Sequence, residues 1–352
     1  MYYLILGIGL LILIKGADIF VESASKLAKL LKIPSFVIGL FVVAIGTSAP
    51  EATIGIISGI SRINHITLGD VVGSSIINIA VVVGITAMII PLKIDSIVSR
   101  TEVLISIFVQ VCLLFFIFTF NIFSRIEAII LIAGMILFSS FTYIKSKKVY
   151  ENRSDVSKFD KEICEYIEMQ GELVGDEDPE SAIAAGKACS EEKDDNVKKS
   201  TKDDSIKKRV ILLIIGLIGL AGGAQLSVNS AVNIARELGL SEIFIGLTVI
   251  AFGTSLPELV TCITAAFKRD HDIAIGNVIG SNIFNVLFVL GISGILHPIA
   301  VNNDIYLDIF VMIGFSVLFS IFVLFIGKIS RMTGFLFFSL YVIYMAIKIS
   351  IL

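Results

Sequence analysis

The sequence has little charge and few side chains that bind soft metals. Only 17% of its 352 residues are charged, and it contains four cysteines, three histidines and no tryptophan. The cysteines show no close metal-ligand spacing, which argues against a zinc site or a disulfide framework. The 28 basic and 31 acidic residues give a formal net charge of -3, so the chain lacks the basic face that nucleic-acid binding requires.

Most of the sequence is apolar. Hydrophobic residues make up 56% of the chain, and the mean hydropathy is +0.93, which is more apolar surface than one soluble core could bury. A membrane-spanning helix needs about 20 apolar residues, and we therefore expect an all-α integral membrane protein. The predicted spans are residues 2–31, 35–59, 67–91, 100–121, 124–144, 209–236, 242–266, 273–297, 304–326 and 331–351.

A polar segment, residues 145–208, separates five predicted spans from the other five. It is rich in Lys, Glu, Asp and Ser and cannot bury enough apolar surface to offset chain entropy, so we expect a largely disordered loop. This divides the chain into a first transmembrane repeat, residues 1–144, the loop, and a second transmembrane repeat, residues 209–352. Basic residues gather at the loop and at short connections on the same side, among them Lys26, Lys29, Lys93, Arg100, Lys145, Lys207, Lys268, Arg269, Lys328 and Arg331. The positive-inside rule then predicts a multi-pass protein of the cell membrane with a cytoplasmic loop and both termini extracytoplasmic.

The two halves repeat the same motifs at an offset of 207 residues. GTSAPE at residues 46–51 recurs as GTSLPE at residues 253–258, and GDVVGSSIIN at residues 69–78 recurs as GNVIGSNIFN at residues 276–285. Five spans per repeat is an odd number, so the second copy enters the membrane from the opposite side and the halves are inverted. Corresponding residues then meet near the bilayer midplane, where we expect Glu51 and Glu258 to converge. A carboxylate at this depth indicates a functional site.

Each motif places oxygen ligands where a helix should break. The proline removes a backbone hydrogen bond, and the carbonyl that it frees needs a partner such as a cation. Residues four apart lie on one helical face. The pairs with this spacing are Thr47 with Glu51, Thr254 with Glu258, Ser74 with Asn78, and Ser281 with Asn285.

Carboxylate, hydroxyl, amide and carbonyl oxygens without sulfur or imidazole suit Ca2+, Mg2+ or alkali cations. Two glutamates are neutralised by one divalent or two monovalent cations, so Ca2+ and Na+ would compete for the same oxygens, and protons also compete for buried carboxylates. Taken singly, a Gly/Ser face or one buried glutamate also fits helix packing, but the duplication favours a binding site. The second half has no charged residues at the positions equivalent to Lys15 and Asp18 of the first span. We therefore interpret these two residues as a local ion pair.

These motifs resemble the two alpha-repeats of the calcium/cation antiporter superfamily, and the chain outside the polar segment is most similar to prokaryotic sodium/calcium exchangers. The resemblance implies ten transmembrane helices in two inverted five-helix repeats, with broken helices and ions bound between the second, third, seventh and eighth. It implies that Glu51 and Glu258 bind both Ca2+ and Na+, and that the carbonyls of Thr47 and Thr254 bind Ca2+. The further ligands that it implies are Ala44, Ser48, Ser74, Ala251, Ser255 and Ser281, with Asn78 and Asn285 at the centre.

The resemblance also implies a function: a secondary antiporter that exchanges about three Na+ for one Ca2+ by alternating access. Asn285 stands where several relatives carry Asp, which makes potassium coupling less expected. The alternatives are a proton-coupled calcium or magnesium exchanger of the same architecture, a passive channel, and an intramembrane hydrolase using paired acids. We expect no enzyme activity and no cofactor, with Ca2+, Na+ and membrane lipid as partners of a monomeric chain.

Overall fold

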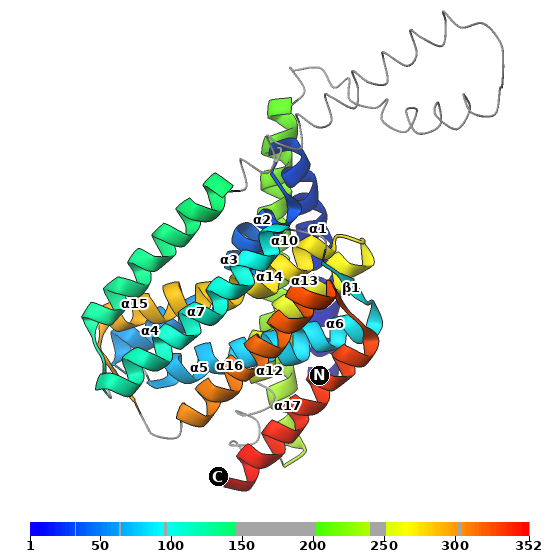
Figure 1. Cartoon of the computed structure of the whole chain (residues 1–352). Coiled ribbons are helices and arrows are strands. Elements are labelled where there is room, and N and C mark those ends of the chain that lie inside the picture. The colour runs from blue at the N-terminus through cyan, green and yellow to red at the C-terminus, as the bar shows by residue number, and fades with distance from the viewer. Residues whose placement is uncertain are drawn as a thin grey trace, which may run out of the picture.

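The computed structural model describes residues 1–31, 33–62, 65–94, 97–120, 122–145, 202–239, 251–301 and 305–351. Almost all of this part is helical (Figure 1). Eight of its helices are long and apolar enough to cross a membrane, and a ninth span results if the bent pair Ser35–Thr47 and Ala49–Ser61 is counted as one. The expected all-α membrane fold is confirmed.

Six of these spans are long helices. Their bounds agree with the predicted spans to within a few residues, except that the second half of the chain begins its first helix at Lys202 rather than at residue 209. They are α1 (Tyr2–Leu31), α7 (Ile97–Phe120), the helix Arg125–Lys145, α10 (Lys202–Glu237), α16 (Ile305–Ile321), which continues into the π-helical turn η5 (Phe322–Ile326), and α17 (Arg331–Ile351).

The spans that carry the repeated motifs are each divided into shorter pieces. In the first half the pieces are α2 (Ser35–Ile38), η1 (Gly39–Val43), α3 (Ala44–Thr47) and α4 (Ala49–Ser61), then α5 (His65–Ile77), η2 (Asn78–Val83) and α6 (Gly84–Ile89). In the second half they are α12 (Ala251–Thr254) and α13 (Leu256–Phe267), then α14 (His271–Phe284), η4 (Asn285–Leu290) and α15 (Gly291–Leu296). The start of the predicted span 242–266 and residues 146–201 of the predicted loop lie outside the described residues.

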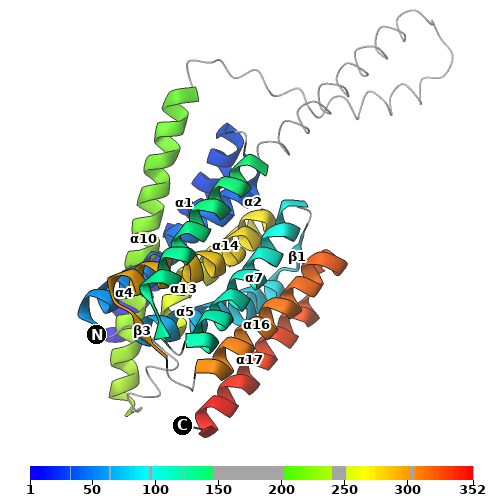
Figure 2. The ribbon, with the colours of Figure 1, turned by 60° about the vertical axis from the view of Figure 1, so that its left-hand side comes forward.

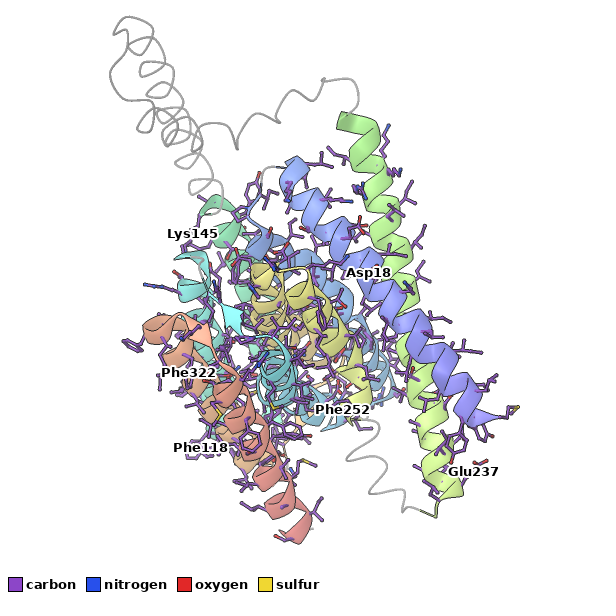
Figure 3. All side chains as sticks on the ribbon, turned by 90° about the vertical axis from the view of Figure 1, so that its right-hand side faces the viewer. Asp18, Phe118, Lys145, Glu237, Phe252 and Phe322 are labelled. Carbon is purple, nitrogen blue, oxygen red and sulfur yellow. The ribbon has the colours of Figure 1, made fainter. Side chains whose placement is uncertain are left out.

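The two spans with the Gly-Ser motif form the centre of the molecule. In their most apolar stretches, 78% of the residues of Ile66–Ile89 and 83% of those of His271–Leu296 are buried, against at most 39% in the other long spans. Small residues allow this packing: a Cβ on Gly280 of α14 would lie 2.2 Å from the carbonyl oxygen of Leu40 in η1. The outer helices instead expose large apolar side chains such as Phe118, as expected for a surface in lipid (Figure 3).

Helices α1 and α10 form a closely packed pair beside this centre (Figure 3). A Cβ on Gly9 would lie 3.2 Å from the carbonyl oxygen of Gly223, and one on Gly16 would lie 3.0 Å from that of Gly216. Residue numbers rise along α1 as they fall along α10, so these two helices, which occupy equivalent places in the two halves, run antiparallel. The predicted inversion of the second half requires this direction.

Two short antiparallel sheets join the halves at their ends. Strand β1 (Leu92–Lys93) pairs with β4 (Lys328–Ile329), and β2 (Ile122–Phe123) pairs with β3 (Ile299–Ala300). Each sheet thus takes one strand from each half. Figures 1 and 2 place both chain termini toward the end opposite to the start of α10, which is the arrangement that an odd number of crossings per half produces.

Candidate cation-binding site

Both copies of the Thr-Ser-x-Pro-Glu motif interrupt their helix at the serine. Ser48 (φ -85°, ψ 14°) separates α3 from α4, and the two parts of this span are bent by 49°. Ser255 (φ -90°, ψ 6°) separates α12 from α13 in the same way. The proline falls in the first turn of the next helix, where its missing N–H is not needed. Each glutamate lies in that same turn, where the helix N-terminus favours a negative charge.

The structure brings the two motifs together in the buried centre. Glu51 is 1% exposed and Glu258 is fully buried. The hydroxyl of Ser48 donates to Oε1 of Glu258 at 3.1 Å, so a residue of the first motif contacts the acid of the second. This contact joins the two motifs across the halves, and the convergence of Glu51 and Glu258 at the midplane stays a prediction.

The site asparagines are held in position by residues of the opposite half. Nδ2 of Asn78 donates to Oδ1 of Asn282 at 3.1 Å, and Nδ2 of Asn285 donates to Oγ of Ser74 at 3.0 Å. Asn282 in turn donates to the carbonyl of Ser75 at 3.4 Å. Asn78 and Asn285 are the first residues of the π-helical turns η2 and η4, a geometry often found at functional sites.

Several buried oxygens of the site have no hydrogen-bond partner in the protein. Buried polar atoms normally do have one, so exceptions on the repeated motifs of both halves call for a ligand. All of them are acceptors with hard character, and they come from both halves. They are Oε2 of Glu51, Oε2 of Glu258, Oδ1 of Asn78, Oδ1 of Asn285, Oγ of Ser255 and Oγ of Ser281. No cluster of three or more His, Cys, Asp or Glu side chains occurs in the described part of the chain, so such a ligand set depends on hydroxyl and amide oxygens as well.

The remaining predicted ligands have other surroundings. Oγ1 of Thr47 donates to Oδ1 of Asn277 at 3.0 Å and to the carbonyl of Ala44 at 3.3 Å. That carbonyl also accepts the backbone N–H of Ser48 at 2.9 Å, so the protein itself already bonds it. Ala251 and Thr254 are the first and last residues of α12.

Sequence reasoning missed three polar residues that belong to this centre. Asn277 binds Thr47, Asn282 binds Asn78, and Asp70, on the same helix as Ser74, has a buried Oδ2 without a protein partner. All three fall within the repeated Gly-Ser motif, on helices that are otherwise apolar. Their position inside the repeat was the signal that could have identified them.

The charges of the first span do not pair as predicted. Asp18 binds Lys268 at 2.7 Å instead of Lys15, and Glu22 binds Lys26 and lies 3.7 Å from Lys268. Lys268 follows the last residue of α13, so this cluster joins α1 to a motif span of the other half. The sequence could not indicate this contact because its partners are about 250 residues apart.

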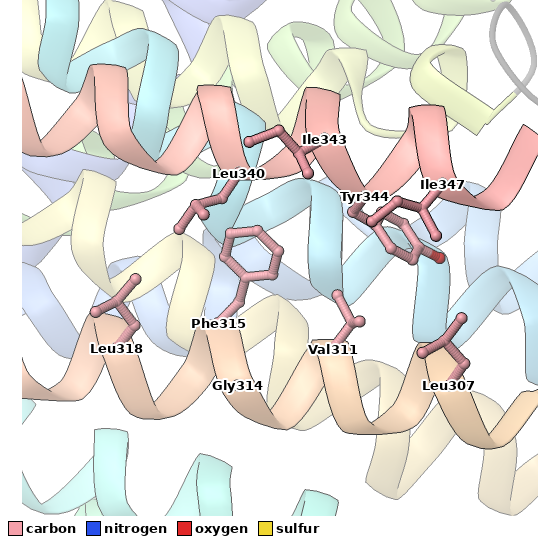
Figure 4. A pocket seen from close by; sticks show the side chains of 9 residues that line it. All are labelled: Leu307, Val311, Gly314, Phe315, Leu318, Leu340, Ile343, Tyr344 and Ile347. Carbon is pink, nitrogen blue, oxygen red and sulfur yellow. The ribbon is translucent and has the colours of Figure 1, made fainter.

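A cavity between α16 and α17 is not suited to cations. Its volume is about 300 Å3, and its lining is almost entirely apolar, with the hydroxyl of Tyr344 at one end (Figure 4). The lining residues are Leu307, Val311, Gly314, Phe315, Leu318, Leu340, Ile343, Tyr344 and Ile347. The centre between the two motifs, in contrast, offers oxygen ligands from both halves.

The comparisons with known proteins agree with this geometry. The chain matches the family described as "Sodium/calcium exchanger protein" over residues 1–144 and 208–350. It is 33% identical over 348 residues to the sodium/calcium exchanger MaX1 of Methanosarcina acetivorans, covering 98% of this chain and 97% of that protein. It is 30% identical over 318 residues to the inner membrane protein YrbG of Escherichia coli, covering 90% and 87%. A solved structure of the sodium-calcium exchanger NCX_Mj, soaked with 10 mM Na+ and zero Ca2+, matches with a TM-score of 0.75 at 29% identity, covering 98% of this chain and 99% of that one.

Proposed function

This chain belongs to the sodium/calcium exchanger protein family, and we propose that it is a secondary antiporter that exchanges Na+ for Ca2+ at the site between its two repeated motifs. The observation that carries the proposal is the group of buried oxygens without protein partners, which includes one from each glutamate and each site asparagine. These oxygen atoms suit Ca2+ and Na+. They do not suit metal ions that prefer sulfur or imidazole ligands.

The exchange follows from the charge of the site. Glu51 and Glu258 are buried, and leaving two carboxylates without cations in a low-dielectric interior is unfavourable. One Ca2+ or two Na+ neutralise them, so binding of one kind of ion displaces the other. The amide oxygens of Asn78 and Asn285 add ligands without adding charge, because an amide is neutral. The hydrogen bonds that their nitrogen atoms donate to the opposite half fix the orientation of the two amides.

Alternating access requires that one part of the protein moves past another. Helices α1 and α10 pack backbone to backbone through their glycines, and their exposed apolar faces suit a lipid surface. We expect the pair to slide as one unit along the motif spans, exposing the site to one side of the membrane and then to the other. The predicted orientation places the polar loop in the cytoplasm and both termini outside.

The test is uptake of 45Ca2+ into Na+-loaded vesicles that contain the purified protein. We expect uptake that depends on the outward Na+ gradient and is lost in Glu51→Gln and in Glu258→Gln. Glu237→Gln is the matched control, because this glutamate is exposed at the end of α10 (Figure 3). Uptake that is independent of Na+, or that persists in both site variants, would refute the proposal. Calcium uptake driven by a pH gradient without Na+ would select the proton-coupled alternative.

A further inference from the structure

The two halves differ at one position inside the repeated Gly-Ser motif. The second half has Asn277, which is fully buried, accepts a hydrogen bond from Thr47 at 3.0 Å and donates one to Sγ of Cys262 at 3.4 Å. The first half has Asp70 at the equivalent place, and its Oδ2 is buried without a hydrogen-bond partner in the protein. At this position, the side chain of Asn277 in the second half both accepts and donates a hydrogen bond. The side chain of Asp70 in the first half has a carboxylate oxygen without a partner.

Asp70 lies on the ion-site face of α5. It is four residues before Ser74 and eight before Asn78, and this spacing keeps all three on one side of the helix. At about 1.5 Å per residue, Asp70 is about 6 Å from Ser74 along the helix axis, toward the end where α4 joins α5.

No ion pair in the described part of the chain includes Asp70. A buried carboxyl group is stabilised either by a proton or by a compensating positive charge. A mobile cation meets this need, and the oxygen of Asp70 that has no protein donor is free to bind it. Building on the proposed exchange function, we propose that Asp70 is a third acidic group of the cation pathway, which binds Ca2+ or Na+ between the α4–α5 side of the membrane and the central glutamates.

The test replaces Asp70 with asparagine, the residue type that the second half has at the equivalent position. Asp70→Asn removes one negative charge and keeps the size of the side chain. Since the loss of one charge on the path of a divalent cation weakens its attraction, we expect the KM for Ca2+ to rise about tenfold from one face of the membrane, with kcat changed by less than about twofold. Asp70→Glu should restore most of the lost affinity. The control is Asp270→Asn, which makes the same chemical change at the residue that directly precedes α14, outside the repeated motif.

Transport is measured in right-side-out and inverted vesicles, together with Ca2+ titration calorimetry on the purified proteins. An increase in KM on one face only, with weaker Ca2+ binding and rescue by Asp70→Glu, supports the assignment. A KM that changes by less than about twofold on both faces, that changes equally on both faces, or that Asp70→Glu does not restore, overturns it. If the wild-type protein binds Ca2+ but shows no Na+-driven uptake, the exchange function fails, and the calorimetry still decides the role of Asp70.

Discussion

The contact between α1 and α10 leads to a sharp prediction at Gly223. A Cβ added there would lie 2.4 Å from the backbone nitrogen of Leu13, 2.7 Å from its Cα, and 2.9 Å from the carbonyl oxygen of Gly9. All three atoms belong to the backbone of α1, so no side chain can turn away to make room. The helices would have to separate by about 1 Å to restore ordinary contact distances.

The neighbouring Gly222 is a matched control. A Cβ at Gly222 would meet nothing within 4 Å. Gly223→Ala and Gly222→Ala make the same chemical change in the same helix, so the gain in helix propensity, up to about 1 kcal/mol, is common to both. The difference between the variants therefore isolates the overpacking at Gly223, which we expect to destabilise the protein by about 1–3 kcal/mol.

Thermal unfolding in detergent and Na+-driven 45Ca2+ uptake in vesicles measure the two consequences. Gly223→Ala should unfold at a lower temperature than the wild-type protein and transport more slowly, because the pair that we expect to slide as one unit has been forced apart. Gly222→Ala should unfold no earlier than the wild-type protein and keep its transport rate. Equal stability and equal transport in the two variants would show that α1 and α10 are not packed as described here.

Three further predictions concern single side chains. Ca2+ at 100 times its dissociation constant should stabilise the protein by about 2.7 kcal/mol, and Glu258→Gln should remove most of this thermal shift; an unchanged shift would place Ca2+ elsewhere. Asn282→Ala should raise the Na+ concentration for half-maximal exchange about tenfold, because the site asparagine that starts η2 loses the acceptor of its amide. Ser75→Ala keeps the backbone carbonyl that Asn282 uses, so equal effects in both variants would contradict this role. Lys145→Met should destabilise the protein by about 3–5 kcal/mol in thermal unfolding, because it leaves the fully buried Glu102 without its partner at 3.4 Å. Adding Glu102→Gln to this variant should recover much of the lost stability. No recovery would count against the ion pair.

The sequence alone determined the membrane class, the approximate bounds of the spans and the position of the duplicated motifs. These features are local: a run of apolar residues long enough to cross a bilayer, a proline at a helix break and a repeat at a constant offset can each be read along the chain. The odd number of predicted spans per repeat also indicated the antiparallel directions of α1 and α10. The predicted convergence of Glu51 and Glu258 rests on the same symmetry.

Only the tertiary structure decided which groups bind one another. Ser48 with Glu258, Asn78 with Asn282 and Asp18 with Lys268 are contacts between helices far apart in the sequence, and their pairing depends on how the helices are rotated and packed. The π-helical turns after the site asparagines are a further result of that packing, since they shift which side chains face the centre. The difference between Asp70 and Asn277 was visible in the sequence, but its consequence was not, because whether a polar atom is bonded or left without a partner depends on the residues that surround it in space.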